Sequence, residues 1–232
     1  KNNGLLPLKR EKIDTILVTG PNAKEESHAI SRYGPSSINV INVLEGIQNI
    51  AGDSIEILYA KGCDIRDKHY PQSEIMNFPL SEKAKENINN AVRKAKKSDV
   101  IIAAMGENEY LVGEGRSRTS LDLPGNQIDL LRALYQTGKP IAMVLINGRP
   151  LSVNWSHKHI SAIVEGMFPG PYGGQAIGEV IFGDYNPGGK LAFTVPKTAG
   201  QIRYNFPYKP GSQNPPAMWG SRMGEKPSMV SD

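Results

Sequence analysis

The sequence predicts an α/β protein, a three-layer αβα sandwich around a mainly parallel sheet of about six strands. Short apolar runs rich in Val and Ile alternate along the chain with longer amphipathic segments. Such alternation favours right-handed crossovers onto a parallel sheet with helices on both faces. Most of the runs are apolar at every position, which is typical of strands buried on both faces.

Five runs are predicted to be strands, and several of them lead straight into glycine, proline or asparagine. The predicted strands are residues 15–19, 55–60, 100–105, 141–146 and 162–167. In a parallel sheet, ligands meet the loops at the carboxyl ends of the strands. We therefore look for chemistry in the segments that follow these runs.

Four segments between the runs have helical periodicity: residues 40–51, 81–98, 126–137 and 174–182. The second is the clearest, because Ser81 is a suitable N-cap and small or apolar residues recur every three or four positions after it. Gly138 is a stop signal for the third.

The length of 232 residues suits one large domain, which we expect over residues 1–208. From Lys209 onward, prolines and glycines among polar residues predict an extended tail or linker over 209–232. The chain starts at Lys1 and stops in loop-like sequence, so both ends are expected to be cut ends of a longer protein.

Composition argues against several classes of partner. The 27 basic residues exceed the 23 acidic ones only slightly, and those of 83–97 fall at helical spacing, which predicts a solvated helix face and no nucleic-acid partner. The longest apolar runs are far too short to span a bilayer, so no membrane partner is expected.

No cofactor and no metal are expected. Cys63 is the single cysteine and is predicted to be a buried, inert thiol. His157 and His159 have no third ligand nearby and are expected in a polar connector. The turn after the first run lacks the second glycine and the Lys-Ser/Thr pair of a phosphate loop, and no Gly-x-Gly-x-x-Gly follows it.

The most unusual segment is 106–118, which carries three carboxylates, two arginines and three glycines between a predicted strand and a predicted helix. Glycines let such a loop project side chains outward, as a binding or catalytic loop requires. A glycosidase needs two carboxyl groups beside the scissile bond, one of them protonated. Glu107, Glu109 and Glu114 could each supply that acid, or could only form ion pairs with Arg116 or Arg118.

The same segment resembles a signature of the second domain of family 3 glycoside hydrolases, EGxDRxxLxLPGxQ. The matching residues are Glu114, Gly115, Arg118, Leu121, Leu123, Pro124, Gly125 and Gln127. Four more stretches resemble motifs of that family in the same order: KNNGLLPL at 1–8, ILVTGPN at 16–22, residues 164–176 and residues 182–196. The family commonly has Asp where this chain has Ser117, so a salt bridge from that position is not expected.

The resemblance implies a retaining exo-acting β-glycosidase, most closely a β-glucosidase, whose (β/α)8 barrel supplies an aspartate nucleophile. That barrel would be an N-terminal domain of the same polypeptide, and the substrate a β-linked glucoside or oligosaccharide. The acid/base position falls on Glu114, with Glu107 as the alternative. Otherwise Glu107 is expected to bind substrate, and Arg118 to order the loop or bind a sugar hydroxyl.

The resemblance also implies export, to the periplasm or outside the cell. A second function remains open at this point: a non-catalytic α/β module that binds a carbohydrate or a nucleotide.

Overall fold

The computed structural model describes residues 1–35, 38–67, 73–74 and 76–201. Within them, five parallel strands form one sheet in the order β2-β1-β3-β4-β5, which confirms the predicted fold class. The strands are β1 (Thr15–Thr19), β2 (Glu56–Ala60), β3 (Val100–Gly106), β4 (Ile141–Ile146) and β5 (Ala162–Glu165). The order reverses between β1 and β3, and in such sheets ligands bind outside the carboxyl ends of the strands at that point.

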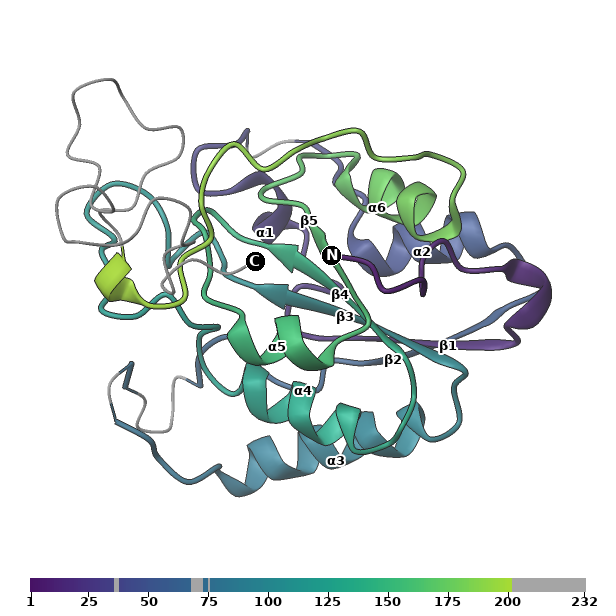
Figure 1. Ribbon diagram of the computed structural model, residues 1–232, viewed down its shortest axis with the longest axis horizontal. Helices are drawn as coiled ribbons and strands as arrows, with labels where there is room; N and C mark the ends of the chain where they lie inside the picture. Colours follow the sequence, from purple (N-terminus) through teal and green to yellow (C-terminus); the bar gives the residue numbers. More distant parts are fainter. Residues whose placement is uncertain (36–37, 68–72, 75, 202–232) are drawn as a thin grey trace, which may run out of the picture.

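Helices cover both faces of the sheet (Figure 1). On one face lie α2 (Val43–Ala51) and α6 (Gly173–Phe182), and on the other lie α3 (Glu82–Ala95), α4 (Gln127–Tyr135) and α5 (Asn154–His159). Alternate residues of each strand feed the two cores: Ile102 and Ala104 of β3 pack toward α2 and α6, whereas Ile101 and Met105 pack toward α3 and α4. Burial of the central strands on both sides explains why most of the runs are apolar at every position.

The sheet has five strands instead of about six in the part of the chain that is described. The sixth position, beside β5, is taken by the N-terminal segment, which forms a single antiparallel bridge between Asn2 and Ala162. Two backbone hydrogen bonds flank it, from Asn3 N to Ser161 O (2.9 Å) and from Ile163 N to Lys1 O (2.8 Å). This segment covers a sheet edge that would otherwise expose unpaired backbone groups.

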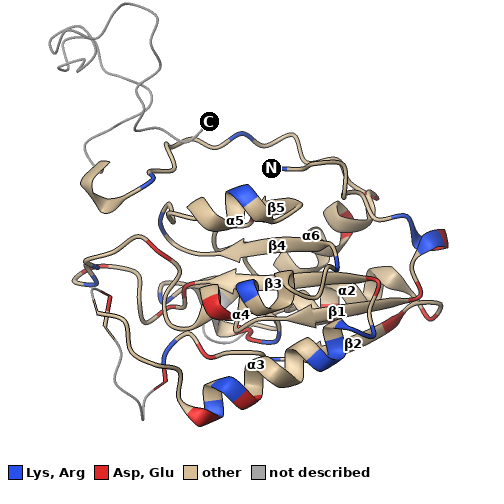
Figure 2. Ribbon diagram, turned by 60° about the horizontal axis from the view of Figure 1, so that its bottom comes forward, with Lys and Arg blue, Asp and Glu red and all other residues tan. Residues whose placement is uncertain are grey.

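Three of the four predicted helices are shorter than predicted, whereas α6 begins one residue earlier than predicted, at Gly173. Asn42 accepts a hydrogen bond from Glu45 N (3.0 Å) while the Glu45 carboxylate accepts one from Asn42 N (3.2 Å), so α2 starts at Val43. Ser81 caps α3 as predicted, accepting from Ala84 N (3.1 Å). Most of the charged residues of α3 are exposed, and Figure 2 shows them distributed along the helix.

Two local predictions were wrong. The fifth strand ends at Glu165 because Met167 has a positive φ of 50°, which turns the chain away from the sheet. His157 and His159 lie in the helix α5, not in a connector, where His159 stacks on Trp155 with ring centroids 4.8 Å apart. Besides α5, three short elements were not predicted: α1 (Ser27–Ile30) and the 3-10 turns η1 (Arg10–Lys12) and η2 (Ala199–Gln201).

The predicted tail, 209–232, lies outside the described residues, as does the end of the predicted domain beyond Gln201. Cys63 is buried, and burial raises the pKa of its thiol. Among the helices that are described, none has the length and apolar character needed to cross a membrane.

Candidate active site

The loop that leaves β3 lies at the carboxyl edge of the sheet, where ligands of a parallel sheet are expected (Figure 1). Gly106, the last residue of β3, has a φ of 129°, and a Cβ there would lie 2.0 Å from the Ile146 carbonyl oxygen. Only glycine can therefore bring the chain this close to the end of β4. The next residue, Glu107, is fixed there by a hydrogen bond from its backbone N–H to Ile146 O (2.8 Å).

Glu107 is fully buried, with no exposed surface. Its Oε1 lies 3.0 Å from Arg118 Nη1 and 3.0 Å from Arg149 Nε, and its Oε2 accepts a hydrogen bond from Gly148 N (3.3 Å). The Arg149 contact is an ion pair without hydrogen-bond alignment. Both carboxylate oxygens are thus engaged by protein groups, and Glu107 acts as an internal counter-ion for two arginines.

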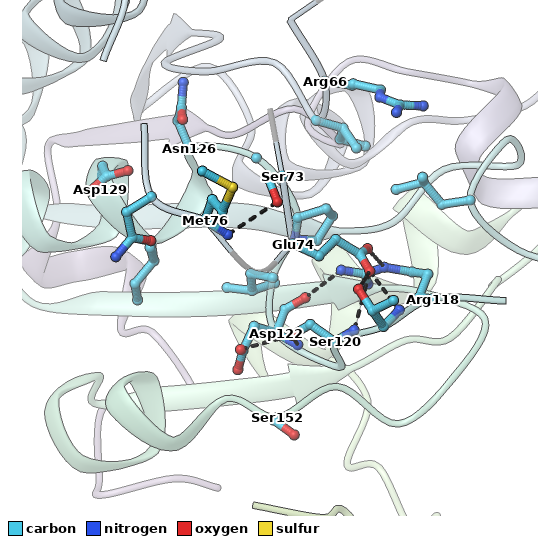
Figure 3. A pocket seen from close by; sticks show the side chains of 18 of the residues that line it. Arg66, Ser73, Glu74, Met76, Arg118, Ser120, Asp122, Asn126, Asp129 and Ser152 are labelled. Carbon is cyan, nitrogen blue, oxygen red and sulfur yellow. Dashed lines mark hydrogen bonds and ion pairs between the residues drawn. The ribbon is translucent and has the colours of Figure 1, made fainter. Parts of the chain in front are cut away.

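The Arg118 side chain is only 4% exposed, and its polar contacts all lie within the protein. Besides Glu107, it contacts the Glu74 carboxylate through Nε and the Asp122 carbonyl oxygen through Nη2 (3.0 Å). Figure 3 shows Glu74 pointing at Arg118 from across the loop. The guanidinium therefore ties two distant segments to the end of β3.

Glu74 also holds the chain just after Arg118. Its Oε2 accepts hydrogen bonds from Thr119 N (2.7 Å), Thr119 Oγ1 (2.7 Å) and Ser120 N (3.2 Å). Burial by itself would raise the pKa of Glu74, but these hydrogen bonds and the Arg118 charge outweigh it and lower the pKa to about 2. The carboxylate is therefore ionised under all ordinary conditions.

Glu114 lies in the exposed part of the same loop. Gly113 and Gly115 on either side have φ values of 109° and 69°, and the Arg116 N–H closes a turn by donating to the Gly113 carbonyl (3.1 Å). The Glu114 backbone N–H donates to the hydroxyl of Tyr33 (2.7 Å). The backbone is thus held in place while the carboxylate has no ion pair with any described residue.

A cleft of about 1030 Å³ lies beside this loop (Figure 3). Its described walls are the 110–125 segment, residues 65–66, 73–74 and 76–79, the start of α4 and the residues that lead into α5. Gly115, Arg116 and Tyr110 line it, together with Trp155 from α5. Glu114 itself is not among the described residues that line it. The loop therefore has one side on the cleft, while the Glu114 carboxylate lies outside that lining.

The turn after β1 packs against the ends of β3 and β4. A Cβ at Gly20 would lie 2.1 Å from the Ala104 carbonyl oxygen, and Asn22 Nδ2 lies 3.1 Å from the carbonyl oxygens of Met105, Glu107 and Ile146. Asn22 therefore braces the strand end from which the Glu107 loop departs.

The structure brings two of the three predicted site residues together, since Glu107 and Arg118 are ion-paired, and leaves Glu114 apart from them. Glu109 is half-buried between these positions. Whether Glu107 and Arg118 bind substrate stays a prediction. In this chain their polar atoms face protein groups, not solvent.

Sequence reasoning missed Tyr33, Glu74 and Arg149. Arg149 carried a usable signal, because it follows β4 directly and so lies at the same edge as the Glu107 loop. Tyr33 and Glu74 lie outside the segments that directly follow strands, and no spacing or motif in the sequence indicates that they meet the loop.

A second carboxylate at this edge, Glu165, ends β5. It accepts a hydrogen bond from the Met167 N–H (3.0 Å), and burial raises its pKa to about 7 against the opposing effect of hydrogen bonds from Met167 and Asn147. β5 is two strands away from β3, from which the Glu114 loop departs, and the partners of Glu165 are Met167 and Asn147, not Glu107 or Glu114.

Comparison with known sequences identifies relatives of this chain. The chain matches the glycosyl hydrolase family 3 C-terminal domain over residues 1–224. A β-xylosidase from Formosa agariphila is 39% identical over 215 residues, which cover 90% of this chain and 28% of that protein. A periplasmic β-glucosidase from Salmonella typhimurium is 40% identical over 225 residues, which cover 90% of this chain and 29% of that protein.

Solved structures give the same picture. A β-glucosidase from Erythrobacter marinus superposes with a TM-score of 0.77 at 34% identity, covering 92% of this chain and 30% of that one. A β-glucosidase from Listeria innocua in complex with isofagomine superposes with a TM-score of 0.76 at 25% identity, covering 99% of this chain and 30% of that one. The chain thus spans less than a third of the length of these relatives.

Proposed function

This chain belongs to glycosyl hydrolase family 3 as its C-terminal domain, and from that premise we propose that it supplies the general acid/base, Glu114, to a retaining exo-acting β-glycosidase. The rest of the active site, including an aspartate nucleophile, would come from an N-terminal (β/α)8 barrel of the same polypeptide. The short span of the chain relative to its relatives supports a role shared with other parts of a longer protein.

One observation carries the choice of Glu114: it is exposed on a loop whose backbone is fixed, and its carboxylate is not held in an ion pair by any described residue. A general acid must reach the leaving-group oxygen and must exchange a proton with it. Glu107 satisfies neither need here, because it is fully buried between two arginines. The geometry therefore supports Glu114 over Glu107.

In the proposed mechanism, Glu114 donates its proton to the glycosidic oxygen as the bond to the sugar breaks and the barrel aspartate bonds to the anomeric carbon. Glu114, now ionised, then takes a proton from the water that releases the sugar from the aspartate. The two carboxyl groups of a retaining enzyme lie about 5–5.5 Å apart across the sugar.

The substrate class is a β-linked glucoside or a related oligosaccharide. Relatives are named as β-glucosidases and as β-xylosidases, and both names fit an exo-acting enzyme on β-glycosides. A periplasmic or secreted location is part of the proposal and is supported by the relative named as periplasmic.

The test is Glu114→Gln in the full-length protein, assayed with a panel of aryl β-glycosides. We expect kcat/KM to fall by about 10²–10⁴-fold for poor leaving groups, which need protonation, and far less for 2,4-dinitrophenol, which does not. Glu82→Gln on the exposed surface of α3 is the matched control and should leave both values unchanged. An equal loss with every leaving group would assign Glu114 to binding and refute the acid/base role.

A further inference from the structure

We propose that Arg149 is a positioning residue that holds the Glu114 loop in its working shape, with Glu107 as the counter-ion that makes this possible. The inference rests on the proposed role of Glu114 and adds a residue from a different strand end. It concerns the loop backbone, because Arg149 does not touch the Glu114 carboxylate.

The contacts of Arg149 span Glu114. Its Nη2 donates to the carbonyl oxygens of Leu111 (2.5 Å) and Arg116 (3.1 Å), one before Glu114 in the sequence and one after it. A single nitrogen atom therefore pins both ends of the 111–116 segment, which closes it into a loop with Glu114 in its exposed part.

The 111–116 segment needs these two hydrogen bonds in order to hold one conformation. Gly113 and Gly115 leave the backbone on both sides of Glu114 free to adopt many conformations, so ordering it costs more entropy than in an ordinary loop. Tyr33 anchors one point within it, the Glu114 N–H. The Arg149 guanidinium holds the two ends of the segment, at Leu111 and Arg116, and so fixes how the segment projects.

The charge of Arg149 is balanced beneath the loop. Its side chain is 20% exposed and its Nε lies 3.0 Å from Oε1 of Glu107, which has no exposed surface. A largely buried guanidinium beside two neutral carbonyls is costly without a counter-ion. Glu107 offsets that cost, which gives the second carboxylate of the loop a function that does not require contact with sugar.

Lysine cannot replace this arginine. The planar guanidinium presents its Nε edge to Glu107 and its Nη2 to the loop at the same time, whereas an ammonium group is a point charge on a flexible stem. Loss of the two hydrogen bonds from Arg149 should displace Glu114 from the leaving-group oxygen. A displacement of about 1 Å can lower the rate 10²-fold.

The experiment uses the full-length protein and measures kcat/KM for the phenyl and 2,4-dinitrophenyl β-glycosides of its best sugar. We expect Arg149→Met and Arg149→Lys to lower kcat/KM about 10- to 100-fold for the phenyl glycoside and less than about 3-fold for the dinitrophenyl glycoside. Arg93→Met on the exposed side of α3 is the matched control and should change neither value.

A double-mutant cycle separates positioning from a purely structural role. In a Glu114→Gln background there is no acid left to position, so adding Arg149→Met should change kcat/KM for the phenyl glycoside less than about 2-fold. Full additivity, an equal loss with both leaving groups, or no loss in Arg149→Met would each overturn the inference.

Two further comparisons distinguish failure of the positioning role from failure to fold and from failure of the proposed function. If Arg149→Met does not fold because Glu107 is left partly unpaired, the charge-balanced Arg149→Met/Glu107→Gln variant, which keeps the Arg118–Glu74 pair, should show the same leaving-group pattern. If Glu114→Gln itself shows no leaving-group preference, the proposed function fails. If it does show one and the Arg149 variants do not, only the positioning role fails.

Discussion

Glu165 shows at the residue scale how a strand end can hold a carboxyl group that is more stable protonated. Burial raises its pKa to about 7, although hydrogen bonds from Met167 and Asn147 favour the ionised form. Desolvation of the carboxylate therefore raises the pKa by more than the two hydrogen bonds lower it. Because the pKa in the unfolded chain is the ordinary one, near 4.5, protonation of Glu165 is linked to folding.

The sign of that linkage predicts a measurable pH dependence. Between about pH 4.5 and 7 the folded protein binds more protons than the unfolded one, so Glu165 makes stability fall as the pH rises through this window. Glu165→Gln in the full-length protein should match the parent near pH 4.5 and exceed it by about 1–3 kcal/mol at pH 8. Thermal melting across pH measures this, with the exposed Glu56→Gln on β2 as the control. Parallel melting curves for parent and Glu165→Gln would contradict it.

At the residue scale, the sequence could identify the loop but not the separate positions of its carboxylates. The turn residues after the 100–105 run directed attention to Glu107 and Glu114 together. The two glutamates differ in burial because of two partners from elsewhere in the chain. Arg149 comes from the next strand end and contacts Glu107, and Glu74 comes from a segment before α3 and contacts Arg118. Burial of one glutamate depends on these tertiary partners, and no local pattern encodes them.

At the scale of elements, strands were predicted best and element ends worst. Four of the five predicted strands agree with the structure to within a residue at each end. The signal is clearest for β3 and β4, which are buried on both faces and are therefore apolar throughout. The exception, β5, was predicted two residues too long, since the apolar Met167 was counted with the strand although the backbone turns there. A positive φ at a methionine leaves no trace in hydrophobicity.

The contact between α2 and α6 provides an element-scale prediction in which two effects oppose each other. Alanine is favoured over glycine inside a helix by about 1 kcal/mol. A Cβ at Gly46, however, would lie 1.9 Å from the Gly174 carbonyl oxygen of α6, so the two helices would have to separate. Overpacking of this kind costs about 1–3 kcal/mol and occasionally more.

We therefore expect Gly46→Ala to destabilise the full-length protein, with a fall in melting temperature measured by calorimetry or circular dichroism. Gly188→Ala is the control, because a Cβ at Gly188 meets nothing within 4 Å and the position has no positive φ. A Gly46→Ala protein at least as stable as its parent would show that the helices can move apart without cost.

At the scale of the whole molecule, the domain presents a fixed loop at one edge of a sheet whose central strands are buried on both faces. The sheet is packed on both faces, and the N-terminal segment covers the outer edge of β5. The carboxyl edge carries the Glu114 loop, the cleft beside it and the bracing Asn22 turn. A rigid support of this kind suits a residue that must act on a sugar held by another domain.

The division of the active site predicts how the isolated chain behaves. Residues 1–232 alone, shown to be folded by circular dichroism, should not release phenol from an aryl β-glycoside, because the nucleophile is proposed to lie in the barrel. The full-length protein should do so, and its Glu114→Gln variant should show the leaving-group preference described above. Calorimetric titration of the isolated chain should detect only weak glucose binding, since most contacts to the sugar would be missing. Tight, stoichiometric binding of glucose or a nucleotide by the chain alone would instead support a self-sufficient binding module.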